Sequence, residues 1–368
     1  MNIVSLQLEQ YRCYEQTSLS FVNGTNIIYG KNAAGKTNIL EAIFLFCTGR
    51  SHRGASDREM IKQGAAFATV KLAFQNSVRD FYGVLKLCEN KKKYITINDV
   101  SIRRMSQLSN YLNVVMFAPE DLSIVKDGPS QRRKFLDMAI SQIHPSYLSF
   151  LSDYIKTMTQ RNNLLREIRQ NRTAIATLDV WDERLAILCS QITQYRDNFI
   201  HEMELYLKPI HAEITKELIE MCYVPNVCQK EEIADAEHMP DLIREKIRRS
   251  RERDIETGLS NVGIHRDDIR FFLEKRDSRR FASQGQQRSI VLSLKLAQTE
   301  LMHEHFNEYP ILLLDDIMSE LDEARRMYLA GKIKGKQVII TCTDRQAAPL
   351  QDQVAYFHVK DRMVRREE

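Results

Sequence analysis

The chain has 368 residues, of which 43% are hydrophobic and 28% charged, a composition typical of a globular protein long enough for two domains. Its 53 basic and 49 acidic residues leave a net charge of only +4, so a site for a polyanion has to be a local patch. The seven cysteines lack metal-ligand spacing. We find neither a signal-peptide pattern nor the run of about 18 apolar residues that a membrane helix needs. These features count against a disulfide scaffold and favour a cytoplasmic protein.

The first 30 residues predict a strand pair that leads into a glycine-rich loop. Alternating apolar residues occupy positions 3–8 and 19–21, and Arg12 lies between these strands. Arg12 could contact a nucleotide bound at the loop, or it could be a solvated loop residue. Residues 26–29 are typical of a short buried strand, and residues 38–46 predict the start of a helix.

The segment between that strand and that helix fits the phosphate-binding pattern G-x-x-x-x-G-K-[ST]. Glycines let the backbone bend closely around a phosphate, and the N–H groups at the helix start face its negative charge. Lys36 is expected to reach the β- and γ-phosphates, and the Thr37 hydroxyl to hold Mg²⁺. The predicted site for ATP or GTP consists of Gly30, Lys31, Asn32, Ala33, Ala34, Gly35, Lys36 and Thr37.

A basic loop follows this helix at residues 49–54. Its Arg50 and Arg53 could contact nucleic-acid phosphates, or they could simply be solvated. Strand-like runs then recur over residues 67–100, which predicts a β-rich extension, and residues 113–117 predict another buried strand.

A change of pattern from about residue 130 to residue 257 predicts a helical region. Glycine is absent between Gly128 and Gly258, and apolar residues recur at helical spacing in two long segments. We therefore expect an antiparallel helical hairpin or a small bundle. The run from Arg244 to Arg253 has six basic and two acidic residues and could contact phosphates, although a solvated helix with ion pairs is slightly favoured.

Alternating strands and helices return after Gly258. The pattern predicts a strand at 269–273, a helix at 285–302 and fully apolar strands at 311–314 and 338–340. Since both ends of the chain supply strands, we predict one α/β nucleotide-binding domain built from residues 1–125 and 258–368. Residues 126–257 are predicted to form a helical lobe inserted into it.

Two adjacent carboxylates follow the apolar strand 311–314, at the end where a parallel sheet places its ligands. A phosphate-binding loop needs such an acid to hold the metal, and we assign this role to Asp315. Asp316 is the candidate to orient the attacking water, because hydrolysis of a phosphate needs a positioned nucleophile and little covalent chemistry. A buried pair of acids is costly without a counter-charge, so a bound cation is the expected partner.

A second helix start suited to phosphate lies far along the chain, at Ser283, Gln284, Gly285 and Gln286. Ser283 can cap the helix, and Gly285 allows close approach of a backbone. One nucleotide rarely needs two such helix starts from one chain. A head-to-tail dimer, in which this second start closes on the nucleotide of the partner chain, explains both.

The serine–glycine–glutamine turn resembles the signature motif of ABC-type ATPases, and Ser319 to Asp322 resemble the loop that crosses their dimer interface. More narrowly, the chain resembles the RecF family of bacterial DNA replication and repair proteins over nearly its whole length. The stretches that carry this resemblance are 30–43, 51–53, 117–122, 128–137, 160–162, 265–268, 283–288 and 312–322.

This resemblance implies an ABC-type P-loop ATPase fold and a cytoplasmic protein that binds ATP and Mg²⁺ and dimerises on ATP. It also implies binding to DNA at gaps or single/double-strand junctions, cooperation with RecO and RecR in loading recombinase, and weak, DNA-dependent ATP hydrolysis. By position, Lys36 and Asp316 are catalytic, Thr37 and Asp315 hold the metal, and residues 283–286 contact the γ-phosphate of the partner's ATP.

Three positions bear on this assignment. Ala33 stands where the family usually has glycine, which could tighten the loop or shift its affinity for nucleotide. Ile264 replaces the usual proline before His265. Thr343 occupies the switch position after the strand 338–340, where transporter ATPases have histidine; this agrees with the family and suggests slow hydrolysis.

Three other functions share parts of this pattern. An ATPase subunit of a membrane transporter has the same loop, acidic strand and signature, but the helical insertion and Thr343 count against it. A chromosome-organising ATPase needs longer heptad repeats than the middle region offers. An ATP-gated clamp that does not hydrolyse ATP is the third alternative.

Overall fold

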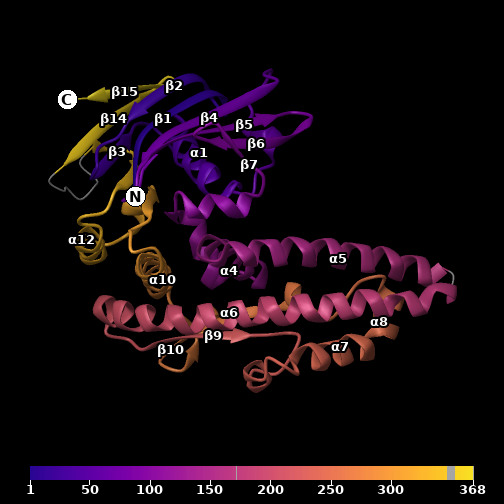
Figure 1. Ribbon diagram of the computed structural model, residues 1–368. Helices are drawn as coiled ribbons and strands as arrows, with labels where there is room; N and C mark the ends of the chain where they lie inside the picture. The colour runs from indigo at the N-terminus through magenta and orange to yellow at the C-terminus, as the bar shows by residue number, and fades with distance from the viewer. Residues whose placement is uncertain (171, 346–352, 368) are drawn as a thin grey trace. The chain divides into compact units, whose positions relative to one another are not determined.

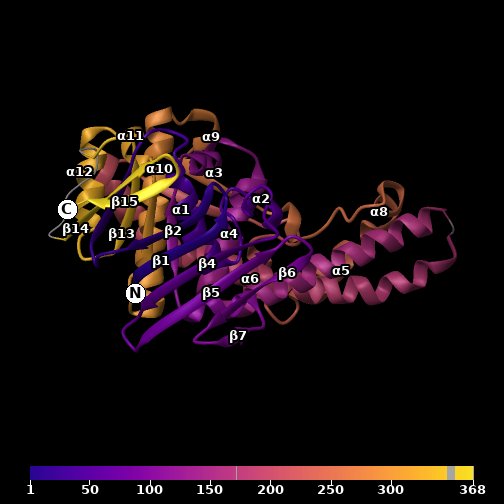
Figure 2. The same cartoon turned by 90° about the horizontal axis from the view of Figure 1, so that it is seen from above.

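The computed structural model describes residues 1–170, 172–345 and 353–367 (Figures 1 and 2). The chain divides into two compact units, Met1–Asp121 with Arg288–Glu368 (unit 1) and Leu122–Gln287 (unit 2). Both ends of the chain belong to unit 1, in agreement with the predicted α/β fold with an inserted helical lobe. The boundaries at residues 125 and 258 stay a prediction, and residues 258–287 lie in unit 2 because their strand pairs with a strand of that unit.

Unit 1 contains two six-stranded sheets. The first has the order β2-β1-β4-β5-β6-β7 and is antiparallel throughout. The second has the order β15-β14-β3-β13-β12-β8, in which β14 to β8 are parallel and β15 is an antiparallel edge strand. Their bounds are β1 (Asn2–Tyr11), β2 (Tyr14–Ser20), β3 (Thr25–Tyr29), β4 (Phe67–Gln75), β5 (Asp80–Cys88), β6 (Lys91–Ile97), β7 (Val100–Ile102), β8 (Val114–Phe117), β12 (Ile311–Asp315), β13 (Val338–Cys342), β14 (Val354–Lys360) and β15 (Met363–Glu367).

The pattern of buried residues along each strand depends on whether its sheet is covered on one face or on both. Every residue of β8, β12 and β13 is buried, as expected for parallel strands that are covered on both faces. In β5, buried and more exposed residues alternate, because one face of the antiparallel sheet is solvated. The apolar runs and the alternating runs in the sequence therefore distinguish the two sheets.

Helix α1 (Lys36–Thr48) lies between the two sheets. It contacts β4 of the first sheet and β8, β12 and β13 of the second. Most of its residues are buried, which explains why its sequence is apolar on every side and not along one stripe. The packing is tight at Gly83 of β5, where an added Cβ would lie 2.2 Å from the ring of Phe46. Helix α1 is thereby packed against strands from both ends of the chain.

Most other helices of unit 1 are short. The exception is α10, which matches the helix predicted at 285–302 and extends beyond it at its C-terminal end. None of the helices within the described residues is long and apolar enough to cross a membrane. Their bounds are α2 (Asp57–Met60), α10 (Gln284–Phe306, which begins in unit 2), α11 (Ile317–Glu320) and α12 (Glu323–Lys332), with the 3-10 turns η1 (Met105–Asn110) and η2 (Pro119–Leu122).

Unit 2 is built around two long helices, α5 (Pro145–Gln170) and α6 (Leu178–Thr215), which pack along each other as the expected hairpin (Figure 1). Shorter helices and turns pack around this pair. They are α3 (Ser123–Lys126), α4 (Pro129–Ile143), α7 (Met239–Arg249), α8 (Arg251–Thr257), α9 (Ser278–Phe281), η3 (Arg172–Thr177), η4 (Glu231–Ala234) and η5 (Ile264–Arg266).

Unit 2 also contains a small sheet. Strand β9 (Ile219–Val224) pairs antiparallel with β10 (Asp268–Leu273), and β11 (Arg276–Asp277) is the third strand. The expectation of helical segments throughout 130–257 is therefore wrong at β9. The strand has only six residues, so its alternating pattern is too short to stand out beside the long helical segments.

Two residues in the stretches that carry the family resemblance have structural roles in unit 2. Arg161 is fully buried and binds Asp182 at 2.6 Å and Asp254 at 2.8 Å. Asp267 is also buried and binds Arg196 at 2.6 Å. A buried charge without a partner is costly. Substitution of one member of such a pair would therefore leave the other charge unpaired and destabilise the folded protein. The Arg161 pairs thus tie α5, α6 and α8 together.

We expect Gly83→Ala to lower the free energy of unfolding by about 1–3 kcal/mol, because the added methyl group must displace the buried ring of Phe46. Denaturant titration of the purified variant measures this change. Gly331→Ala in α12 is the matched control, since nothing lies within 4 Å of its added Cβ. We expect the control to be neutral or stabilised by roughly 0.5–1 kcal/mol. Equal stability of the two variants would contradict the tight packing of α1.

Candidate functional site

The glycine-rich loop, residues 30–37, connects β3 to α1 as predicted. Gly30 and Gly35 have φ angles of 147° and 113°, which other residues rarely adopt. A Cβ at Gly30 would lie 2.3 Å from the carbonyl oxygen of Val359, and a Cβ at Gly35 would lie 2.7 Å from Sγ of Cys13. Both positions therefore require glycine, for their backbone angle and for their close neighbours.

Ala33 adopts a backbone conformation that favours glycine. Its φ angle is 62°, in the left-handed region. For an L-residue with a Cβ this conformation costs roughly 1–2 kcal/mol. Strain of this kind is typically found at ligand-binding loops, where surrounding contacts hold the backbone in place. The alanine therefore does not prevent the left-handed turn, but it makes the turn less stable than glycine would.

The side chain of Lys36 lies against its own loop. Its Nζ donates hydrogen bonds to the carbonyl oxygens of Gly30 at 2.7 Å and Lys31 at 3.0 Å. Burial lowers the pKa of Lys36, whereas the nearby carboxylates of Asp316 and Asp315 act in the opposite direction. A cation held in this way can exchange carbonyl oxygens for the more strongly binding oxygens of a phosphate.

The carboxylate of Asp315 joins the loop to the second sheet. Its Oδ1 accepts hydrogen bonds from the hydroxyls of Thr37 at 2.9 Å and Thr341 at 2.6 Å. Asp315 is the last residue of β12, and Thr341 lies beside it on β13 in the parallel register. The structure thus brings Thr37 and Asp315 together. It adds Thr341, which the sequence analysis missed and whose only signal is its place at the end of the neighbouring apolar strand.

These oxygen atoms are of the type that Mg²⁺ prefers in nucleotide sites, where it takes one or two protein ligands and completes its shell with phosphate and water. Over residues 1–170, 172–345 and 353–367, no group of three or more histidine, cysteine, aspartate or glutamate side chains could hold a metal ion by itself. The donors at Thr37 and Asp315 therefore fit a metal that arrives with a nucleotide better than a permanently bound one.

Asp316 follows directly and has an unusual backbone. Its φ angle is 49°, and its N–H donates to the hydroxyl of Thr341 at 3.0 Å. Burial raises the pKa of the Asp316 carboxyl; the charge of Lys36 opposes this, and the charge of Asp315 adds to it. A carboxylate with a raised pKa is a better proton acceptor than an ordinary aspartate.

Residues 283–286, which we name the signature turn, lie in unit 2 at the start of α10. Ser283 Oγ accepts a hydrogen bond from the Gln286 N–H at 3.2 Å, and Gln286 Oε1 accepts one from the Ser283 N–H at 2.8 Å. This reciprocal pair is a capping box, so Ser283 caps the helix as predicted. Ser283 and Gln284 are exposed, which leaves them accessible to another molecule.

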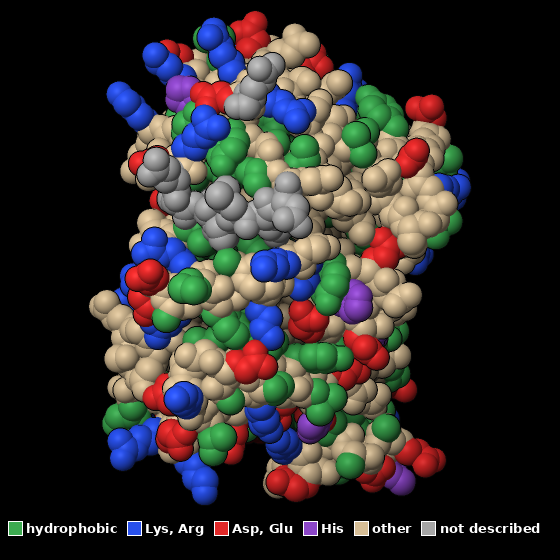
Figure 3. All heavy atoms as spheres, turned by 90° about the vertical axis from the view of Figure 1, so that its left-hand side faces the viewer, with side chains coloured by type: hydrophobic (Ala, Val, Ile, Leu, Met, Phe, Trp, Pro, Cys, Tyr) green, Lys and Arg blue, Asp and Glu red, His purple; other side chains and the backbone are tan. Residues whose placement is uncertain are grey.

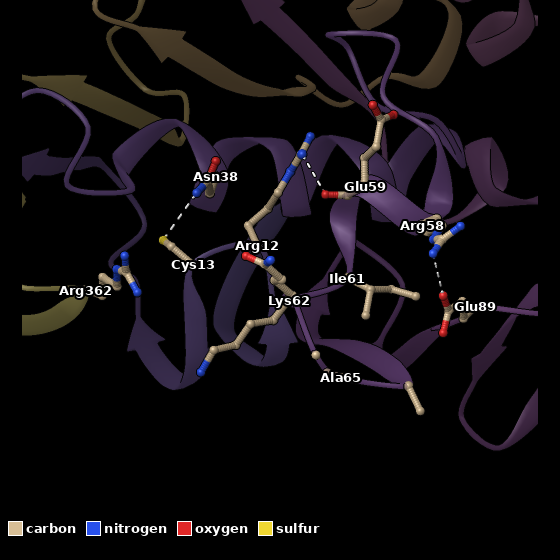
Figure 4. A pocket seen from close by; sticks show the side chains of 13 residues that line it. Arg12, Cys13, Asn38, Arg58, Glu59, Ile61, Lys62, Ala65, Glu89 and Arg362 are labelled. Carbon is tan, nitrogen blue, oxygen red and sulfur yellow. Dashed lines mark hydrogen bonds and ion pairs between the residues drawn. The ribbon is translucent and has the colours of Figure 1, made fainter.

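A pocket of about 1080 Å³ opens beside the start of α1 (Figure 4). Its lining includes Cys13 and Asn38, which form a hydrogen bond of 3.3 Å between Asn38 Nδ2 and Cys13 Sγ. Since Cys13 also lies against Gly35, the pocket borders the glycine-rich loop. Figure 4 shows these two residues on one side and the ion pair of Arg58 and Glu89 on the other. No sequence pattern predicted this pocket, because its lining comes from separate segments.

Arg12 also lines the pocket and is held by Glu41 of α1. Its Nε and Nη2 donate to the two carboxylate oxygens of Glu41 at 2.8 and 2.7 Å, and its Nη1 donates to the carbonyl of Glu59 at 2.8 Å. Burial alone would raise the pKa of Glu41, but hydrogen bonds from Arg12 and Ser51 bring that pKa below its ordinary value. Arg12 is therefore a fixed residue of the pocket wall and not a solvated loop residue.

The basic residues considered as DNA contacts are spread over several elements. Arg50 and Arg53 are exposed in the loop after α1. The run from 244 to 253 is broken at Ser250 into α7 and α8, and several of its arginines are paired within unit 2. Arg249 binds Glu245 at 2.9 Å, and Arg251 binds Asp182 at 2.6 Å. These pairs support the interpretation of a solvated, ion-paired segment.

We expect Asp316→Asn to raise the melting temperature of the nucleotide-free protein at pH 7. Burial and the charge of Asp315 disfavour the ionised form of Asp316, so its pKa is higher in the folded than in the unfolded chain. Ionisation on raising the pH therefore destabilises the wild type, and the advantage of the variant should disappear below about pH 4. Thermal unfolding across this pH range measures the difference. Asp80→Asn, on an exposed strand end, is the control. An Asp316→Asn melting temperature at or below wild type at pH 7 would contradict this account.

The sequence pattern of the RecF/RecN/SMC N terminal domain family matches residues 2–365 of this chain. One curated relative is the DNA replication and repair protein RecF of Lachnoclostridium phytofermentans, which is 43% identical over 345 residues, 93% of each chain. Another is the protein of the same name from Exiguobacterium sp. (strain AT1b), which is 40% identical over 365 residues, 98% of each chain.

Solved structures agree with this relationship. The structure of the recombination mediator protein RecF with ATP, in the RecFOR pathway, matches with a TM-score of 0.93 and 32% identity over 100% of this chain and 97% of that chain. An SMC head bound to the C-winged helix domain of ScpA matches with a TM-score of 0.58 and 15% identity over 100% and 97% of the two chains, a likeness of fold alone. The chain belongs to the RecF family of DNA replication and repair proteins.

Proposed function

We propose that this chain is an ATP-dependent DNA-binding protein of recombinational repair and replication restart. The observation that carries the proposal is the cluster of Lys36, Thr37 and Asp315 at a glycine-rich loop, in a chain of the RecF family. Its relatives are named as DNA replication and repair proteins, and a similar solved structure is that of RecF with ATP.

ATP is the nucleotide we assign to the loop. Backbone N–H groups of the loop and of the α1 start would face its phosphates. Lys36 would leave the carbonyl oxygens of Gly30 and Lys31 for the β- and γ-phosphate oxygens. Thr37 and Asp315 would hold Mg²⁺, which neutralises phosphate charge when bound. Thr341 orients Asp315 for this role through its hydrogen bond.

Asp316 is the residue we assign to orienting the attacking water. Its raised pKa favours acceptance of a proton, and Thr341 fixes its backbone. Thr343 follows the neighbouring strand β13 and is exposed. Its hydroxyl is not a base, so it would not assist the transfer of a proton from the attacking water. We therefore propose a weak ATPase that is stimulated by DNA.

The adenosine group of ATP would bind in the pocket beside the glycine-rich loop. The pocket borders Gly35 through Cys13, and Asn38 of α1 and Arg12 supply polar groups. Its volume of about 1080 Å³ exceeds the needs of an adenosine group, so the base would occupy only part of it. The contact of Arg12 with Glu41 would keep the wall of the pocket fixed while the nucleotide enters.

The proposed active form is a head-to-tail dimer. Each chain would supply a P-loop to one ATP and a signature turn to the other. Ser283 and Gln284 are exposed at a helix start, the arrangement that favours an anionic partner. The γ-phosphate of the partner chain's ATP would then complete the contact with Ser283, Gln284, Gly285 and Gln286.

DNA is the proposed macromolecular ligand, bound at gaps or single/double-strand junctions through its phosphates and without sequence preference. The net charge is only +4, and lysine, arginine and acidic side chains are interspersed on the face drawn in Figure 3. DNA binding would therefore need a local patch assembled on the dimer. By family relationship we also propose a cytoplasmic location and action with RecO and RecR in loading recombinase.

A transporter subunit and a non-hydrolysing clamp are the two alternatives to this function. Membership of the RecF family removes the ground for a transporter subunit, which rested on motifs that both classes share. The non-hydrolysing clamp differs from the proposed ATPase only in turnover. A second carboxylate, Asp316, directly follows the proposed metal ligand Asp315 at the end of β12, and this favours the ATPase.

Sedimentation velocity with and without ATP, Mg²⁺ and gapped DNA tests this proposal. We expect wild-type protein to dimerise with ATP and to bind two gapped DNAs of unrelated sequence with similar affinity. Lys36→Ala should remain monomeric with ATP, because it loses the cation that holds the β- and γ-phosphates.

The matched control is Lys334→Ala, at an exposed lysine far along the chain from the loop. It should dimerise like wild type. A Lys36→Ala protein that still dimerises with ATP would remove the basis of the composite site. A single preferred DNA sequence that persists at high salt would contradict recognition through phosphates.

A further inference from the structure

The segment Ser319–Asp322, which we name the interface loop, is tied to the first turns of α10 by two arginines. Nη2 of Arg288 lies 3.2 Å from Oε2 of Glu320. Arg325 pairs with Asp322 and donates from its Nε to the hydroxyl of Ser289 at 2.8 Å. Two consecutive residues of α10 thus bind the interface loop or its neighbouring helix. In both Figure 1 and Figure 2, α12 lies beside α10.

The same turns of α10 continue from the signature turn. Ser283 and Gln286 close the helix start with their capping box, and Arg288 follows two residues after Gln286. A capped α-helix is a stiff element over such a short distance. A displacement of the signature turn would therefore be passed to Arg288 and Ser289, and from them to the interface loop.

The other end of the interface loop is joined to Asp316. Ser319 donates from Oγ to the carbonyl oxygen of Asp316 at 2.8 Å, across the single turn of α11. Asp316 itself adopts a left-handed backbone with a φ of 49°. Such conformations persist where surrounding contacts hold them. Contacts within unit 1 thus run from Arg288 through the interface loop to the residue we assign to orienting water.

The guanidinium of Arg288 has one N–H group that could bind a second partner. Its Nε–H is buried and has no hydrogen-bond partner among the residues that the structure describes, although Nη2 is bound to Glu320. The side chains of Arg288 and Glu320 are 39% and 29% exposed, and a pair this exposed contributes little to folding. Loss of this pair is therefore expected to change stability little.

We propose that Arg288 and Arg325 are positioning residues that couple the signature turn of a chain to its own Asp316. Contact of the signature turn with the partner's ATP would act through Arg288 and the interface loop on Asp316 at the chain's own nucleotide. Each site would then hydrolyse ATP faster when the other is closed. This inference rests on the proposed ATP-dependent dimer.

A charge exchange tests the coupling. Arg288→Glu and Glu320→Arg should each lower kcat for ATP roughly fivefold, the effect of losing one partly exposed ion pair. The melting temperature, and the affinity of the monomer for ATP by equilibrium binding, should stay near the wild-type values. The double exchange restores opposite charges in reversed order and should recover kcat to within about twofold, which a purely local defect would not do.

Arg326→Glu is the matched control, because Arg326 is exposed on α12 beside Arg325 and its backbone has the same helical setting. It should keep the wild-type kcat. Wild-type protein that fails to dimerise with ATP would overturn the proposed function and the coupling with it. If wild type dimerises, then unchanged single variants, a double exchange no better than the singles, or an equal defect in Arg326→Glu would overturn the coupling alone.

Discussion

The carboxylate of Asp315 is the contact on which the rest of the site depends. It accepts hydrogen bonds from Thr37 at the start of α1 and from Thr341 at the end of β13, so one side chain joins three segments that are far apart in sequence. None of these groups would be held in place without the central parallel strands, which keep Asp315 buried. The proposed nucleotide site is thus built from several segments of unit 1 and not from the glycine-rich loop alone.

Helix α1 explains why unit 1 has two sheets. Its apolar residues point in all directions, and a helix of this kind has to be covered on every side. The first sheet is local, since its strands come from the first 102 residues, whereas the second combines strands from both ends of the chain. Unit 2 is inserted between those ends, and α10 begins in unit 2 and continues into unit 1.

Local patterns were enough to predict much of this structure. The loop 30–37, the acidic end of β12 and the signature turn each have their signal within a few neighbouring residues, and the α/β fold follows from their order. Long-range features had no such signal. Thr341 matters only because β13 lies beside β12, and Arg12 is fixed only because Glu41 faces it from α1. The short strand β9 was hidden among helical segments.

The composite site is the central claim, and mixing two inactive variants tests it most directly. Lys36→Ala removes the lysine that would bind the phosphates of the chain's own ATP. Ser283→Arg places a bulky side chain at the signature turn, where it would prevent contact with the partner's ATP. In a mixed head-to-tail dimer one site carries both defects and the other carries neither. An equimolar mixture should therefore recover up to about a quarter of wild-type ATP hydrolysis, the share expected from random pairing of two chains. A mixture as inactive as the separate variants, although Ser283→Arg folds and binds ATP, would contradict a site completed by a second copy of the chain.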